Sequence, residues 1–175
     1  MTNEEYEYLW NKRHSVIARA EISALYHQKR ERFFELCDKL GKAVSVIGGS
    51  AAIWKIKNNA LVEYLAILIT VTSTMSLVFG FSEKSKRHAE LSRKYKAVIA
   101  DIAGVGERNF TEDNINSWEE KIRVIEVEEP PALSALVRLC QNELAHAAND
   151  KKAIIKLSFH ERLFAHFLDM PVKSA

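Results

Sequence analysis

One stretch of the chain, from Tyr64 to Phe81, carries no charge over eighteen residues. As an α-helix rising about 1.5 Å per residue, this run would be about 27 Å long, close to the roughly 30 Å hydrocarbon core of a bilayer. The length and the lack of charge favour a membrane span over 60–82. Five serine and threonine residues within the run weaken its preference for lipid, so a buried helix of a soluble bundle stays open as the alternative.

A second apolar stretch lies upstream, from Ala43 to Trp54. Its twelve residues alone would reach only about 18 Å as a helix, a length more typical of a core or re-entrant helix. The span extends to 40–56 if Lys42 and Lys55 place their ammonium groups at the two interfaces. We therefore expect the two stretches to form one transmembrane helical hairpin.

Basic residues are distributed unevenly about this hairpin. Its flanks, 27–42 and 83–98, carry eleven Lys or Arg, whereas the turn between the spans carries two, Lys55 and Lys57. Because positively charged loops stay on the cytoplasmic side, this asymmetry predicts a multi-pass membrane protein with both termini in the cytoplasm.

Apolar residues recur at three- and four-residue spacing on both sides of the hairpin. The pattern predicts a cytoplasmic amphipathic helix over 1–39 and a helical extension over 83–103, packed on each other. Three further helices are expected over 111–170. The expected stripe after the second span is Phe81, His88, Leu91, Tyr95, Val98 and Ile102, and the expected apolar face of the helix that follows is Ile115, Trp118, Ile122 and Ile125.

Three signals delimit these C-terminal helices. Thr111 is the expected N-cap of the first helix, and the two prolines at 130–131 end it. Proline at the first helical position is expected to open the second, and Ser158–Glu161 matches a capping box for the third. With no convincing strand, the predicted class is all-α: a two-transmembrane hairpin with long cytoplasmic helical extensions and a small C-terminal helical bundle.

The composition and the candidate catalytic residues do not favour an enzyme. A net charge of +2 is too small to predict binding to a nucleic-acid duplex. Cys37 and Cys140 alone cannot hold zinc, and reduced thiols are expected. His160 and His166 lie six residues apart, not the four of a zincin motif, and Glu143–His146 lacks the second copy that a di-iron bundle needs. We expect no catalytic site, metal or cofactor.

The second span has a polar sector. At 100° per residue, Glu63, Thr70 and Thr74 fall within one narrow sector, with Ser73 beside it. Such a stripe can line a water-filled path between subunits, so these four residues are the candidate pore lining. Alternatively, the hydroxyls only bond the carbonyls of their own helix, one turn back.

Small residues gather in the first span. Gly48, Gly49, Ser50, Ala51 and Ala52 would let another membrane helix approach closely. This patch is the candidate interface of a homo-oligomer. Packing within the hairpin alone is the alternative.

A basic group follows the second span. It consists of Lys84, Lys86, Arg87, His88 and Arg93. The group is expected to contact anionic lipid headgroups, and an anionic nucleotide is the competing ligand.

The layout resembles the SLATT family of two-transmembrane effector domains, which accompany bacterial nucleotidyltransferases and SLOG nucleotide sensors. The resemblance lies in "SALYHQKRERFFELCDKLGKA" entering the first span, "FSEKSKRHAELSRKYKAVIADI" leaving the second, and "LCQNELAHAAND" near the C-terminus. It covers nearly the whole chain and treats 1–175 as a single domain. The likeness lies in the architecture and in scattered residues, and it includes no invariant catalytic motif.

The resemblance implies an effector of prokaryotic anti-phage defence. Such effectors stay silent until a nucleotide second messenger, or a separate nucleotide-signalling protein, releases them. They then form a pore or disrupt the inner membrane and halt growth of the infected cell. Two spans cannot enclose a pore, so a cyclic homo-oligomer would be required. A non-conducting, membrane-anchored interaction protein and a soluble helical bundle are the competing hypotheses.

Overall fold

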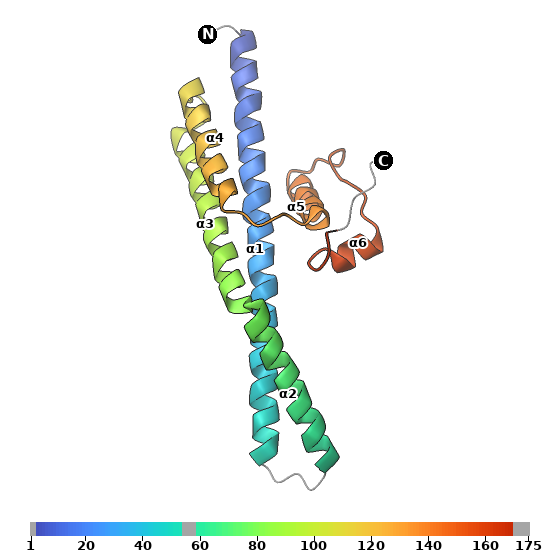
Figure 1. The fold of residues 1–175 in the computed structure, drawn as a ribbon. Coiled ribbons are helices and arrows are strands. Elements are labelled where there is room, and N and C mark those ends of the chain that lie inside the picture. Colours follow the sequence, from blue (N-terminus) through green and yellow to red (C-terminus); the bar gives the residue numbers. More distant parts are fainter. Residues whose placement is uncertain (1–2, 54–58, 170–175) are drawn as a thin grey trace. The chain divides into compact units, whose positions relative to one another are not determined.

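The computed structural model describes residues 3–53 and 59–169, except for the side chains of residues 51–53, 59 and 61. Within these residues every regular element is a helix, which confirms the predicted all-α class. The helices are coloured along the chain in Figure 1. They are α1 (Asn3–Ile53), α2 (Asn59–Phe79), α3 (Phe81–Val105), α4 (Glu112–Val127), α5 (Ser134–Ala147) and α6 (Phe159–Phe164).

The chain divides into two compact units. The first, here called the core unit, comprises residues 1–29 and 89–175, and the second, here called the apolar unit, comprises residues 30–88. Helices α1 and α3 each contribute residues to both units.

The main hydrophobic core of the core unit lies among the first part of α1, α3 and α4, which run side by side (Figure 1). Small residues of α1, including the fully buried Ala20, belong to this core and allow the neighbouring helices to pack closely. The predicted apolar positions of α3 and α4 that belong to the core unit are all buried, so the helical periodicity is confirmed there. They are Leu91, Tyr95, Val98, Ile102, Ile115, Trp118, Ile122 and Ile125. Of the two predicted positions in the apolar unit, His88 is buried and Phe81 is half-buried.

Two polar side chains inside this core, His27 and Ser92, have partners within hydrogen-bond distance. His27 Nε2 lies 2.8 Å from Glu129 Oε1, and the His27 ring stacks on Tyr95 with 5.9 Å between ring centroids. Ser92 Oγ donates to the Ala24 carbonyl at 3.0 Å. Burial, reinforced by the Glu129 carboxylate, raises the pKa of the Tyr95 phenol far above its usual value. The phenol therefore stays neutral at any physiological pH.

The capping predictions are confirmed at two helices. Thr111 caps α4, since its hydroxyl accepts from the Asn114 N–H at 3.3 Å while Asn114 Oδ1 accepts from the Thr111 N–H at 2.9 Å. Ser158 and Glu161 form the same reciprocal arrangement at the start of α6. The Ser158 N–H bond lowers the pKa of the Glu161 carboxyl.

The predicted start of α5 is wrong. The helix begins at Ser134, three residues after the second proline, with Leu133 as its N-cap and no side-chain cap. Distant groups instead satisfy the first amides. The Leu133 N–H donates to Tyr26 Oη at 3.1 Å, and the Ser134 N–H donates to Asp169 Oδ1 at 3.0 Å. Proline at the first helical position is therefore not needed to remove an unpaired donor.

In the apolar unit, the second half of α1 lies beside α2, and α2 leads into α3 through Gly80 (Figure 1). Gly80 has a φ of +56°, a left-handed conformation that residues with a Cβ rarely adopt. Near this bend, the Phe34 ring stacks on Phe81 and on His88, with centroid distances of 6.4 and 5.5 Å. Phe34 and His88 are buried, so the start of α3 is held by an aromatic cluster.

Candidate functional site

The apolar surface of α2 is the most unusual feature of the chain. The helical segment Val62–Val105 includes an eighteen-residue window with a mean hydropathy of 1.8, and none of that window is buried. By length and composition it is the one segment among the described residues that could cross a membrane. The large apolar side chains of α2 that face outward are Tyr64, Ile67, Leu68, Val71, Met75, Leu77, Val78 and Phe79.

The predicted first span lies partly outside the described residues, because the structure describes α1 only as far as Ile53. Within α1, Val46 and Ile47 are about two-thirds exposed, at 68% and 67%. The second half of α1 therefore also presents apolar side chains away from the α1–α2 contact.

Helices α1 and α2 meet along small residues. Ser45 Oγ and Ser73 Oγ share a hydrogen bond of 3.3 Å, and a Cβ at Gly48 would lie 2.7 Å from Ile69 Cγ1. These positions follow i, i+4, i+7 spacing on each helix, which keeps them on one face. We call this contact the α1–α2 seam. It consists of Gly41 facing Ser76, Ser45 facing Ser73, and Gly48 facing Ile69.

The candidate pore residues do not share one environment. Ser73 lies in the seam, where it also borders a cavity of about 610 Å³, whereas Glu63, Thr70 and Thr74 are exposed on α2. The Thr70 hydroxyl donates to the Ala66 carbonyl one turn back, at 2.8 Å. The structure thus brings Ser73 to α1 and leaves the other three on the outer surface.

The small-residue patch of α1 is likewise divided. Gly48 is buried in the seam, whereas Gly49 is exposed and has no described atom within 4 Å of where a Cβ would stand. Ser50 is exposed and donates to the Val46 carbonyl at 2.8 Å. The side chain of Ala52 lies outside the described part of the chain. The close approach of α1 to α2 therefore depends on Gly48, whereas Gly49 lies on the face of α1 that points away from this contact.

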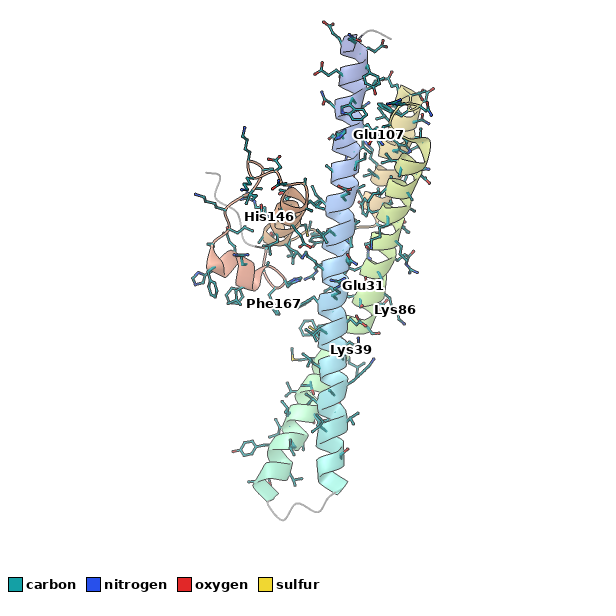
Figure 2. All side chains as sticks on the ribbon, turned by 180° about the vertical axis from the view of Figure 1, so that it is seen from behind. Glu31, Lys39, Lys86, Glu107, His146 and Phe167 are labelled. Atoms are coloured by element: carbon teal, nitrogen blue, oxygen red, sulfur yellow. The ribbon has the colours of Figure 1, made fainter. Side chains whose placement is uncertain are left out.

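The basic group after α2 is also divided. The Lys84 ammonium lies over the Phe34 and Phe79 rings, 5.7 and 5.9 Å from their centroids, while His88 is buried against Phe34. Lys86 is exposed on α3 (Figure 2). Two members remain: Arg87 is exposed in the apolar unit, and Arg93 belongs to the core unit.

Sequence reasoning missed Ser45 as a member of the site. The available signal was the spacing of Gly41, Ser45 and Gly48, which places three small residues on one helix face. Its hydroxyl also donates to the Gly41 carbonyl at 3.0 Å, so Ser45 links the two helices without leaving its own polar group unpaired.

No family model, curated protein or solved structure matches the chain. The apolar surface of α2 and the α1–α2 seam are therefore the features of the molecule that bear on its function.

Proposed function

We propose that this protein is a membrane-embedded effector of the SLATT type that assembles in the inner membrane of a prokaryote and permeabilises it. The observation that carries the proposal is the apolar surface of α2, which no described part of the chain covers. The proposed trigger, a nucleotide second messenger or a nucleotide-signalling protein, follows from the resemblance to that family.

The magnitude of the exposed surface supports a bilayer around α2. Eight large apolar side chains of this helix face outward. Burying one such side chain stabilises a protein by roughly 1.5–3 kcal/mol. If these eight partly exposed side chains faced water, the protein would lose on the order of 10 kcal/mol of stabilising free energy that their burial would provide. This is comparable to the whole net stability of a typical domain, about 5–15 kcal/mol. A few scattered surface leucines would expose far less apolar area than this. A bilayer around α2 would cover these side chains.

The proposed topology is a hairpin with spans over 40–56 and 60–82 and with both termini in the cytoplasm. Labelling in intact cells tests it: Asn58→Cys should react with an impermeant maleimide, whereas Ser117→Cys, on the exposed side of α4, should react only after lysis. Reaction at Ser117→Cys in intact cells, or none at Asn58→Cys in any preparation, would exclude this topology.

The proposed oligomer uses the faces that the α1–α2 seam leaves open. Gly49 has open space beside it, and Glu63, Thr70 and Thr74 face outward from α2. In a closed ring of hairpins, one such face can meet a neighbouring subunit while the polar sector lines the central path. A ring of Glu63 carboxylates would concentrate cations at the mouth.

The decisive experiment combines a membrane-potential dye with growth measurements on cells that express the protein. The wild type should depolarise the membrane and stop growth. Replacing Thr70 and Thr74 together with leucine should preserve insertion and abolish depolarisation. Thr72→Leu is the matched control, because Thr72 lies on the side of α2 opposite the polar sector. Glu63→Gln should alter ion preference more than expression.

The second candidate is a membrane-anchored interaction protein that conducts nothing. The self-satisfied hydroxyls of Thr70 and Thr72 favour it, since hydroxyls bonded to their own helix need no water-filled path. Growth arrest without depolarisation would select this candidate. A protein that fractionates entirely with the soluble contents of the cell would refute both.

A further inference from the structure

The C-terminal part of the core unit contains a cavity that the proposed membrane activity does not use. It has a volume of about 660 Å³, within the range of sites that bind metabolites and cofactors. Its walls come from α1, α5, the segment that follows α5, and α6. Figure 2 labels His146, which lines it at the C-terminal end of α5.

The charged side chains of this cavity are mostly basic. Lys29, Lys156 and Arg162 line it together with one carboxylate, Glu143. That carboxylate forms an ion pair with Lys29, whose Nζ lies 2.6 Å from Glu143 Oε2. Within the part of the chain that the structure describes, neither Lys156 nor Arg162 forms an ion pair, and both are exposed to solvent. An anion entering the cavity would therefore meet two uncompensated cations.

The wall that carries these cations is fixed before any ligand binds. The Asn142 side chain clamps the backbone of Ile155, donating to its carbonyl and accepting from its N–H, both at 2.7 Å. Lys156 is the next residue along the chain. Arg162 lies in α6, whose first turn is held by the capping box of Ser158. Such preorganisation lowers the entropic cost of binding.

An apolar surface lies beside the cations. Leu139 of α5 and the segment residues Ile154 and Leu157 line the same cavity. A small inorganic ion would leave this surface without a partner, whereas a ligand with a ring or carbon skeleton would cover it.

We propose that this cavity binds an organic phosphate of metabolite size, with its phosphate group between Lys156 and Arg162 and its apolar body on Leu139 and Leu157. Arg162 can present two parallel N–H donors to the phosphate oxygens, and Lys156 supplies a second positive charge. The proposal holds whether or not α2 crosses a membrane, because every residue of the site belongs to the core unit.

Calorimetric titration of the full-length protein in phosphatidylcholine nanodiscs, with ADP as the probe, tests the proposal. ADP should bind, and adenosine should bind at least tenfold more weakly because it lacks the phosphates. Lys156→Ala and Arg162→Ala should each weaken ADP binding at least tenfold. Lys152→Ala, a change of the same kind in the same segment but outside the cavity lining, should have no effect.

Glu143→Gln separates ligand binding from a structural role. The substitution releases Lys29 from its ion pair, so ADP should bind several-fold more tightly even though a contact has been lost. No ADP binding, equal binding of adenosine, or an equal effect of Lys152→Ala would overturn the proposal. Loss of ADP binding when the nanodiscs contain phosphatidylglycerol would assign the cavity to lipid headgroups, and would also overturn it.

Discussion

Replacing Gly48 with alanine would place a methyl group inside the α1–α2 seam. The added Cβ would lie 2.7 Å from Ile69 Cγ1, whereas carbon atoms in favourable contact are about 3.5–4.0 Å apart. An isoleucine in a helix is held almost entirely in one χ1 rotamer, so its side chain cannot simply rotate away. Either α2 must move outward or the isoleucine must adopt a strained conformation.

Gly49→Ala provides the reference for the size of this effect. Both substitutions replace a helical glycine with alanine. This change by itself stabilises a helix by about 1 kcal/mol, because alanine has the higher helix propensity. Only the one at Gly48 also overpacks a contact, at a cost of about 1–3 kcal/mol. Because the propensity gain is common to both, the two variants should differ in free energy of unfolding by about 1–3 kcal/mol. This corresponds to a ratio of roughly 5 to 150 in the unfolding equilibrium constants.

Reversible unfolding in mixed detergent micelles, followed by circular dichroism, measures this difference. Ile69→Ala removes the atoms that the new methyl group meets, so combining it with Gly48→Ala should recover part of the loss in a double-mutant cycle. Equal stability of the two alanine variants, or no coupling between positions 48 and 69, would refute the close packing of α1 on α2.

Three further results are expected. Ser45→Cys and Ser73→Cys together, with both native cysteines replaced by alanine, should form a disulfide on mild oxidation, because the native hydroxyl oxygens are 3.3 Å apart; failure to crosslink in monodisperse protein would contradict the seam. In the wild type, maleimide at pH 8 should modify Cys37 well before Cys140, which is fully buried and whose pKa burial raises to about 12; mass spectrometry that finds Cys140 modified first would contradict its burial. Thr111→Ala should lower the free energy of unfolding by about 1 kcal/mol through loss of the α4 cap, whereas Thr111→Ser should be near neutral, and equal thermal shifts would argue against capping.

Sequence periodicity predicts the core unit well because its helices bury one face against their neighbours. Ile115, Trp118 and Ile122 follow the spacing of a half-buried helix, and all are buried. The start of α5 could not be predicted in this way. Its first backbone N–H groups donate to Tyr26 and Asp169, which are distant in sequence. Rules for helix starts use only residues that are close together in the chain.

The candidate site in the apolar unit shows a different limit. Helical spacing places Ser73 beside Thr70 and Thr74, but it does not say which of them faces a partner helix. That depends on the register between α1 and α2, which the close fit of Gly48 against Ile69 helps to set. The periodicity of a single sequence predicts each helix, but it does not predict which residues of α1 and α2 face each other. The seam could therefore be identified only in the structure.

The apolar surface of α2 also has a consequence for how the chain is made. A helix that leaves eight large apolar side chains uncovered would aggregate if released into water, since nothing in the described chain shields it during synthesis. If α2 enters a bilayer as proposed, we expect it to be captured while the chain is still on the ribosome, before the core unit is complete, because most of that unit's residues lie C-terminal to α2. Production in a cell-free system should yield soluble, monodisperse protein only when lipid or detergent is present from the first round of translation.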